Sequence, residues 1–577
     1  MRQHILTTAL AAAVSALAFG QNLNPTVEVT NAYEGGASSI SKPAQQMAVP
    51  DSVTRFNLDF DYSVFEKPFK GAYEFRPYYV QLKPEPMANT EEKFYLRTGA
   101  GFTFHPELDM VWSPVRKEKF RLNFYANHHS YFGRYHQFDL GNKADGVYPL
   151  VSIDKSGGYL ADTKVGADAS YGWNGGVATL DVDYRHRMAD IAWHNQKMGG
   201  VEAKARVRSL PSNEPHFLYD AAVRYHYLDS DLSHTRGADY GSYTREVSES
   251  AFSLDGTFGP VLDEDHRILV DLDMDLARYR RDKFGYTGLL SVTPKYQFNL
   301  DRWYFSLGAK VAAIIYSDDF NLWGEAYQHK SGTFFPDVHI DYHLLDDRLI
   351  LQTSATGGDR FNSFSGRFFS RPFTYEGVFG HGTERIRAMI GARGNIASRF
   401  RYDLQAGYAR WAHTPVDGLV IIEPVSEGSF PILPAQYEKS FNLLFADLDY
   451  GWKSESVTVD GRLAWRRSNI RGDYAFAPAA LTGFIRPAYN WGERVKAGFD
   501  VAWSTRQKAT LTNDAGDVID NYVVPGWVDL GLFAEYRFTH RLGFWAKGGN
   551  LLNQAVQRTP LVAEAGMYFT AGILLNF

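Results

Sequence analysis

Cysteine is absent from the 577 residues of the chain. The absence excludes disulfides, thiolate metal sites, a cysteine nucleophile and the lipid anchor of a lipoprotein. After the first twenty residues there is no run of 18 apolar residues, so no transmembrane helix is expected. The net charge of −6 is small for this length and gives no indication of a nucleic-acid partner.

Aromatic residues and glycine are abundant instead. Phe, Tyr and Trp make up 15% of the chain, and there are 51 glycines. Aromatic side chains favour strands and glycine favours tight turns, so the composition indicates a protein with many strands.

The first twenty residues have the pattern of a secretory signal peptide. Arg2 gives a positive start, an apolar stretch runs from Ile5 to Phe19, and the small residues Ala18 and Gly20 precede Gln21. This pattern predicts cleavage after residue 20 and export of the mature chain.

Alternating segments dominate the chain from about residue 72. In "TLDVDYRHR", Leu180, Val182 and Tyr184 alternate with charged residues, and "KFRLNFYAN" (119–127) repeats the pattern. Period two predicts strands with one apolar and one polar face. A soluble sandwich also alternates, but these segments are long and one face is charged in strand after strand. The pattern therefore favours an all-β transmembrane antiparallel barrel, apolar outside and polar inside.

The connections alternate between short and long. Short links fall near 114–119, 173–176, 210–215, 262–266, 300–301, 345–347, 397–399, 455–456, 491–493 and 538–541, with longer ones between them, such as 188–198 and 280–286. Bacterial barrels pair short periplasmic turns with longer outer loops. With 93–112 as one strand and 71–84 as a strand before it, the count is about 22, and 20 to 24 would be acceptable. The barrel is then 71–577, both of its ends are periplasmic, and the last strand pairs with 71–84.

The C-terminal 55 residues resemble those of TonB-dependent receptors. The matching parts are "VDLGLFAEYRF", the turn "THR", "GGNLLNQ" and the apolar terminal strand. The resemblance implies an outer-membrane barrel of 22 strands in a Gram-negative bacterium. It also implies a signal for the barrel-assembly machinery, formed by Thr570, Gly572, Leu575 and Phe577.

Those receptors carry a plug domain of about a hundred or more residues before the barrel, and residues 21–70 are too few for it. We interpret 21–70 as a periplasmic arm or a reduced plug. A barrel of this size encloses a wide lumen. Three things could close it: this arm, inward-folded loops or a partner protein.

Two segments are candidates for binding. Residues 26–30 resemble a TonB box, although an ordinary extended tail is the plainer interpretation; they are Thr26, Val27, Glu28, Val29 and Thr30. The aromatic loop 360–382 could grip a ligand or partner at the outer mouth, fold into the lumen, or pack against its neighbouring loops. Its candidate residues are Arg360, Phe361, Phe364, Arg367, Phe368, Phe369, Arg371 and Phe373.

No pattern indicates catalysis, a cofactor or a metal centre. Asp337, His339, Asp341 and His343 share one face of one strand, about 7 Å apart, and suit a hydrated luminal wall better than a metal site. His128 and His129 point to opposite faces. We therefore expect a protein that is not an enzyme.

The leading functional hypothesis is uptake of a solute or nutrient across the outer membrane, with lipid and the assembly machinery as partners and TonB as a possible one. The alternative is a non-conducting scaffold for surface or periplasmic proteins.

Overall fold

The computed structural model describes residues 93–577 apart from 145–146, 192–193, 211–215, 236–241, 282–284, 317–320, 323–324, 327–332, 367–372, 374–379, 422–431, 470–478, 493 and 514–517. Every described residue belongs to one compact unit, Pro50–Phe577. The predicted signal peptide, the 21–70 arm, the TonB-box-like residues Thr26 to Thr30 and the strand 71–84 lie outside the described residues.

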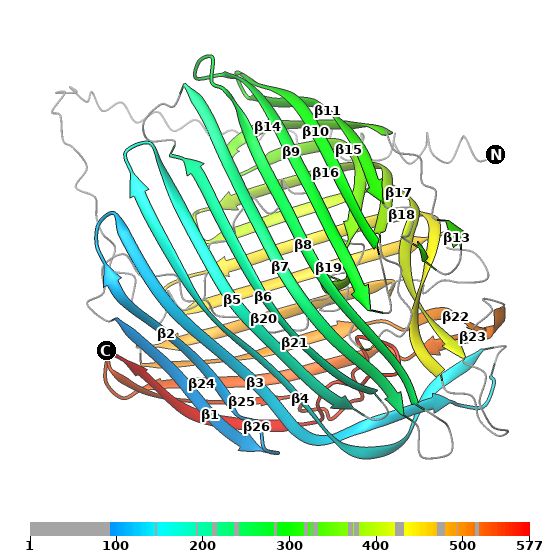
Figure 1. Ribbon diagram of the computed structural model, residues 1–577. Helices are drawn as coiled ribbons and strands as arrows, with labels where there is room; N and C mark the ends of the chain where they lie inside the picture. Colours follow the sequence, from blue (N-terminus) through cyan, green and yellow to red (C-terminus); the bar gives the residue numbers. More distant parts are fainter. Residues whose placement is uncertain are drawn as a thin grey trace, which may run out of the picture. The chain divides into compact units, whose positions relative to one another are not determined.

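The described chain is built from strands, drawn in Figure 1. None of its helices is long and apolar enough to span a membrane. The strands are β1 (Phe94–Phe102), β2 (Glu107–Arg116), β3 (Phe120–Leu140), β4 (Tyr148–Trp173), β5 (Gly176–Ile191), β6 (His194–Ser209), β7 (Phe217–Thr235), β8 (Ser242–Pro260), β9 (His266–Arg281), β10 (Gly285–Leu300), β11 (Trp303–Tyr316), β12 (Asn321–Leu322), β13 (Glu325–Ala326), β14 (Thr333–Asp347), β15 (Ile350–Asn362), β16 (Gly380–Ile396), β17 (Phe400–Ile421), β18 (Ile432–Lys453), β19 (Val457–Ser468), β20 (Leu481–Trp491), β21 (Val495–Ser504), β22 (Gln507–Asn513), β23 (Val518–Val524), β24 (Trp527–Arg537), β25 (Leu542–Gly549) and β26 (Tyr568–Asn576).

Twenty-two of these strands form a closed antiparallel barrel, which confirms the predicted fold and strand number. Only the hairpins β12–β13 and β22–β23 stand outside the ring among the described strands. The ring closes where β1 pairs with β26, from Tyr95 opposite Asn576 to Phe102 opposite Phe569. Closure leaves neither terminal strand with an open edge.

The prediction of which strand meets the C-terminal strand was wrong. The partner of β26 is β1, not 71–84, and the segment 93–112, predicted as one strand, is the hairpin of β1 and β2. Its turn, 103–106, is only four residues long. Phe102 just before the turn and Phe104 within it are 74% and 63% exposed. Pro106 is the only turn-forming residue in it, and Phe104 continues the apolar alternation of β1 through the turn.

Side chains alternate between the outer and the luminal face as predicted. On β5, Leu180, Val182 and Tyr184 are exposed on the outer face, whereas Asp183 between them is only 7% exposed and faces the lumen. On β3 the apolar Phe120 and Phe124 are exposed, whereas Asn123 is only 5% exposed and faces the lumen. An exposed apolar outer face with a polar inner face is the pattern of a transmembrane barrel.

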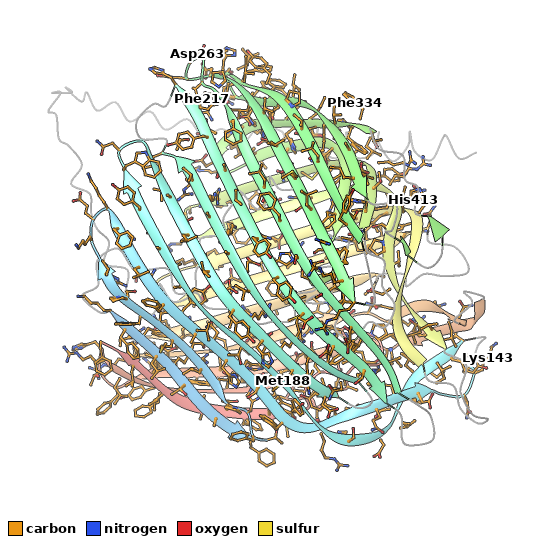
Figure 2. All side chains as sticks on the ribbon, viewed as in Figure 1. Lys143, Met188, Phe217, Asp263, Phe334 and His413 are labelled. Carbon is orange, nitrogen blue, oxygen red and sulfur yellow. The ribbon has the colours of Figure 1, made fainter. Side chains whose placement is uncertain are left out.

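The two ends of the barrel differ. Ten short turns lie at the end that holds the C-terminus, close to the predicted positions, and Phe217 and Asp263 lie at this end in Figure 2. Lys143 and His413 lie at the opposite end. Because bacterial barrels have short periplasmic turns, the end with the C-terminus is periplasmic and the other faces the exterior.

Several strands continue past the membrane at the outer end. β3 and β4 contain 21 and 26 residues, whereas about 9–11 residues are enough to cross a bilayer. The long links predicted at 188–198 and 280–286 were largely wrong, because β5, β6, β9 and β10 run on and leave only 192–193 and 282–284 between strands. Strand pairing continues there because neighbouring long strands still satisfy each other's backbone groups in water.

The hairpin β22–β23 bridges opposite sides of this outer mouth. Leu419–Ile421 of β17 pair in parallel with Leu511–Asn513 of β22, and Tyr522 and Val523 of β23 pair in parallel with the start of β4. In the ring β4 and β17 are the fourth and fifteenth of twenty-two strands, so they are eleven strands apart on opposite walls. The hairpin β22–β23, hereafter the bridge, joins these walls at the lower right of Figure 1.

A hydrophobic core packs against the bridge. It unites residues from β3, β4, β17, β18, the bridge hairpin and the loop between β25 and β26, and it includes Phe138, Leu150, Trp411, Leu419, Phe445, Leu511, Tyr522, Leu561 and Ala563. Trp411 is 1% exposed and Tyr522 is fully buried. Residues from opposite walls thus share one core inside the mouth, which is unusual for a face that would otherwise line water.

Candidate luminal site

A cavity of about 440 Å³ lies inside the barrel next to the seam of β1 and β26. It is lined by β1 to β5, by β21, β24 and β25, and by the loop 550–567, with Phe373 closing one side. Its walls combine acidic and basic side chains with three histidines. The cavity is therefore the place in the described lumen where polar groups converge on free space.

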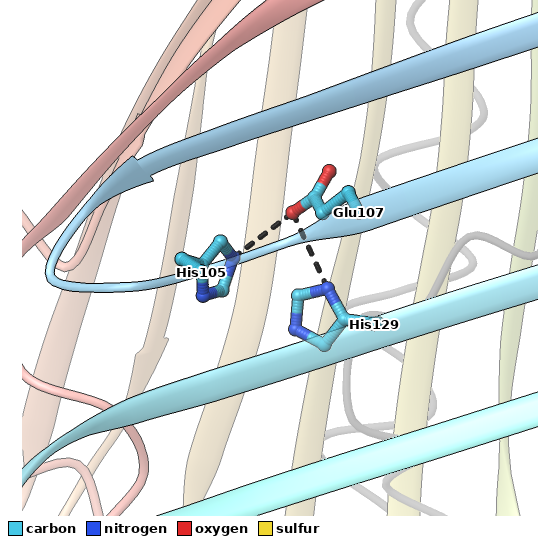
Figure 3. A group of neighbouring side chains, drawn as sticks. All are labelled: His105, Glu107 and His129. Atoms are coloured by element: carbon cyan, nitrogen blue, oxygen red, sulfur yellow. Dashed lines mark hydrogen bonds and ion pairs between the residues drawn. The ribbon is translucent and has the colours of Figure 1, made fainter.

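His105, Glu107 and His129 form a compact group on the cavity wall (Figure 3). The turn between β1 and β2 carries His105, Glu107 is the first residue of β2, and His129 lies opposite Glu107 on β3. One carboxylate oxygen of Glu107, Oε1, lies 2.9 Å from His105 Nε2 and 3.2 Å from His129 Nδ1. Among the described residues no other group of three or more potential ligand side chains lies this close together.

The local packing fixes the two imidazole rings. His105 stacks on Tyr568 with ring centroids 4.3 Å apart and meets the edges of His129 and Tyr131. Its Nδ1 has no hydrogen-bond partner among the described residues. Burial lowers the pKa of His105, although the hydrogen bond to Glu107 opposes that effect. The ring is consequently held in one orientation and favoured in its neutral form.

Two cations surround Glu107. The ammonium of Lys547 on β25 pairs with Glu107 Oε1, and Arg97 lies 4.0 Å from Oε2. Arg97 also pairs with Asp109 at 3.3 Å and covers the ring of Trp545 at 3.8 Å. These contacts tie β1, β2, β3 and β25 together around one buried carboxylate.

Elsewhere the luminal wall neutralises its own charge. Lys164 meets Asp183 at 3.1 Å, Lys295 meets Asp271 at 2.8 Å and Arg401 meets Asp460 at 2.7 Å. Further pairs join Arg185 to Asp162, Arg206 to Asp220 and Arg486 to Asp500. In these pairs, acidic and basic side chains of the described luminal wall neutralise each other at short range.

The loop 550–567 forms one wall of the cavity. Asn550 ties it together, because its side-chain amide donates to the carbonyls of Gln554 and Ala565. Arg558 contacts Glu564 at 2.6 Å and Asp529 at 3.4 Å. Val562 packs with Phe373 and a patch of β3, β5 and β7. This loop, between the last two strands, folds inward rather than outward.

The predicted assembly residues all lie at the seam. Thr570 and Gly572 face the lumen on β26, and Phe577 is 54% exposed beyond it. A Cβ added to Gly572 would meet the carbonyl oxygen of Thr98 at 1.9 Å, so only glycine lets β1 and β26 approach as they do. The close approach of the two strands explains this glycine without any recognition by the assembly machinery. Recognition of Thr570, Gly572, Leu575 and Phe577 by the assembly machinery stays a prediction.

The described part of the aromatic loop folds into the barrel. Glu249 receives hydrogen bonds from the backbone nitrogens of Phe364 and Ser365, at 2.6 and 3.1 Å, and from His226. Phe364 and Phe373 are 6% and 1% exposed. Of the alternatives for this loop, these contacts are those of folding into the lumen.

The remaining candidates in that loop divide into two groups. Arg360 pairs with Glu384 and lies 4.7 Å over the ring of Trp411, and Phe361 packs beside two apolar clusters. Arg367, Phe368, Phe369 and Arg371 lie outside the described residues. Ligand binding by the loop stays a prediction.

The group around Glu107 was not predicted from the sequence, where His128 and His129 point to opposite faces of one strand and His105 and Glu107 were not candidates. The signal available was the short spacing His-x-Glu beside a strand that carries a histidine. The aspartates and histidines of β14 are wall residues instead, with His339 bonded to Asp337 at 3.2 Å and Asp341 to Arg393 at 2.8 Å.

Comparison with known proteins identifies the architecture. No protein-family model matches the sequence, and no curated protein is significantly similar to it. Solved structures do match. An iron transporter from Neisseria meningitidis superposes with a TM-score of 0.60 at 9% identity, covering 85% of this chain and 81% of the transporter. The ferripyoverdine receptor of the outer membrane of Pseudomonas aeruginosa has a TM-score of 0.60 at 12% identity, with 85% and 72% covered. A copper transporter has a TM-score of 0.58 at 13% identity, with 86% and 81% covered.

The chain has the TonB-dependent receptor fold. Its barrel resembles those of Gram-negative outer-membrane receptors, as the C-terminal strands implied. At these identities the likeness extends to the fold and not to a cargo.

Proposed function

We propose that this TonB-dependent-receptor-like barrel takes up a solute across the outer membrane, and that it transports rather than catalyses. The observation that carries the proposal is the luminal cavity of about 440 Å³ beneath an outer mouth spanned by the bridge. A binding space on the inner side of an entrance that a separate hairpin spans is the arrangement that a gated transporter needs. Structural neighbours whose titles name an iron transporter, a siderophore receptor and a copper transporter support a nutrient as cargo.

In this proposal the bridge is the outer gate. It is held at its ends by few backbone pairings, three residue pairs to β17 and two to β4, whereas ring neighbours such as β3 and β4 share pairings along most of their length. The weakest elements of a structure open first. Opening therefore separates the hairpin β22–β23 from the walls and leaves the ring closed.

The second candidate function is a non-conducting scaffold. The observation that favours it is the apolar core behind the bridge, in which Trp411, Leu419 and Tyr522 are buried as deeply as in a soluble domain. A mouth packed in this way would hold its shape for a bound surface protein. The two functions differ in whether any route through the barrel can open.

Ion conductance in planar bilayers separates the two candidates. Four proteins are compared in KCl: the full chain, a deletion of 21–70, a replacement of 505–526 by a Gly-Ser linker, and the double variant. The transporter proposal expects large steps in the double variant and few or none in the full chain. A double variant that is as silent as the full chain would favour the scaffold.

TonB coupling belongs to the same proposal. Added-strand pairing with residues 26–30 would connect the barrel to the energy source. The test is capture of the purified periplasmic domain of TonB by the full chain and by a chain that lacks Thr26 to Thr30. Equal capture by both would remove these residues from the proposal.

A further inference from the structure

We infer that His105, Glu107 and His129 bind one divalent transition-metal ion, of the Zn²⁺ or Cu²⁺ class, at the turn of the β1–β2 hairpin. The inference does not depend on what the barrel transports. It rests on the identity of the three side chains, on their spacing and on the free space beside them.

The donor set suits this class of ion. Two imidazole nitrogens and one carboxylate oxygen are the ligands of many three-residue zinc sites, and imidazole also suits copper. Bonds of about 2.0–2.1 Å in a tetrahedral site place ligand atoms about 3.3 Å apart. The distances from Glu107 Oε1 to the two nitrogens, 2.9 and 3.2 Å, are close to that edge length. All three ligand atoms lie within 4.8 Å of one another, so small side-chain shifts suffice to enclose an ion.

The surroundings hold the ligands ready. The stacking of His105 on Tyr568 and its edge contacts fix the ring before any ion arrives. Because Nδ1 of His105 has no partner among the described residues, that nitrogen can carry the proton and leave the lone pair on Nε2, the atom that faces Glu107. The three ligands line the cavity, so a fourth position is open to water or to a bound group.

Lys547 competes with the ion. Its ammonium pairs with the same oxygen of Glu107 that an ion would use. Metal binding therefore has to release this contact, and the lysine keeps the carboxylate neutralised when no ion is present. An ion bound here would connect the β1–β2 turn, β2 and β3, and so would stabilise the hairpin beside the seam.

The experiment measures Zn²⁺ binding to the purified full chain, first stripped with a chelator, by competition with a chromophoric zinc indicator. We expect one site per chain. His129→Ala and Glu107→Gln should each weaken binding by at least about 100-fold, the upper end of what outer-sphere partners cost. Lys547→Met should tighten it at least about tenfold, because it removes a like charge beside the ion.

The matched control is His226→Ala. His226 forms a comparable buried pair with Glu249, with Nε2 and Oε1 2.7 Å apart, but has no second histidine nearby in the described structure. This variant should bind zinc as the unchanged protein does. His105→Gln, in the hairpin turn, replaces His129→Ala should that variant not fold. Absence of a zinc site in both the full chain and Lys547→Met, or undiminished binding in His129→Ala or His105→Gln, would overturn the inference.

Discussion

The stability of the seam between β1 and β26 should depend on the absence of a side chain at Gly572. Replacing Gly572 with alanine puts a methyl group 1.9 Å from the carbonyl oxygen of Thr98 and 2.6 Å from the Cα of Gly99. Ordinary contacts begin at 3.4 Å, so β1 has to move away by about 1.5 Å. A shift of that size breaks backbone hydrogen bonds on both sides of the residue.

The structure gives the size of the effect. Overpacking typically destabilises by about 1–3 kcal/mol. Two lost ladder hydrogen bonds add about 0.5–1.5 kcal/mol each. We expect Gly572→Ala to lower the free energy of unfolding by about 2–6 kcal/mol. Gly172→Ala on β4 is the control, because a Cβ there meets nothing within 4 Å and should change stability by no more than about 0.5 kcal/mol.

Urea unfolding from phospholipid vesicles, followed by tryptophan fluorescence and by gel mobility without boiling, measures both variants. Refolding into vesicles needs no assembly machinery, so a loss of stability there reports the geometry of the seam and not recognition of a signal. If Gly572→Ala were as stable as Gly172→Ala, the close approach of β1 and β26 would not be what this glycine serves.

Two further predictions concern the inward-folded loops. Trp411→Ala leaves a cavity in the core behind the bridge and should lower the local stability by about 3–5 kcal/mol. We expect faster hydrogen exchange in Leu419–Ile421 and β22, while β5 and β6 stay protected. Trp465→Ala, whose ring is 39% exposed on the outer face, is its control, and equal exchange in both variants would show that Trp411 does not hold the bridge. Glu249→Gln leaves at least one of the three donors to the carboxylate without an acceptor. The local stability of the turn at 363–366 should therefore fall by about 1–3 kcal/mol, measured as faster hydrogen exchange of the Phe364 and Ser365 amides. Unchanged exchange would mean that Glu249 does not anchor this turn.

Much of the barrel could be predicted from the sequence, because strand alternation is a local property. The outward positions of Leu180, Val182 and Tyr184 follow from period two alone, and the short turns follow from where that period breaks. The first strand was misplaced because the apolar turn at 103–106 does not interrupt the alternation, so the β1–β2 hairpin looked like one long strand.

The site around Glu107 could not be predicted for a related reason. A bulge between Trp112 and Val115 shifts the register of β2 against β3 by one residue. Without it Glu107 would lie opposite Ser130, and His129 would point to the other face. The sequence contains no clear signal for this bulge. The contact between Glu107 and His129 is therefore seen only in the structure.

The bridge was beyond sequence analysis because its contacts are not local. Leu419 and Leu511 are paired across almost a hundred residues, between segments that each look like part of an outer loop. The sequence allowed inward-folded loops as one way to close the lumen. In the structure, Trp411, Tyr522 and Phe373 form part of this inward packing.

The most direct test of a gated barrel is to lock the bridge. Pro149 of β4 and Val523 of β23 are direct partners, and the chain has no cysteine, so Pro149→Cys with Val523→Cys makes one defined disulfide. Conductance of this double-cysteine protein, with residues 21–70 also removed, is recorded oxidised and then after reduction. The account predicts no openings while the disulfide is intact and openings once it is reduced. Equal conductance in the two states would contradict the claim that the bridge is the outer gate.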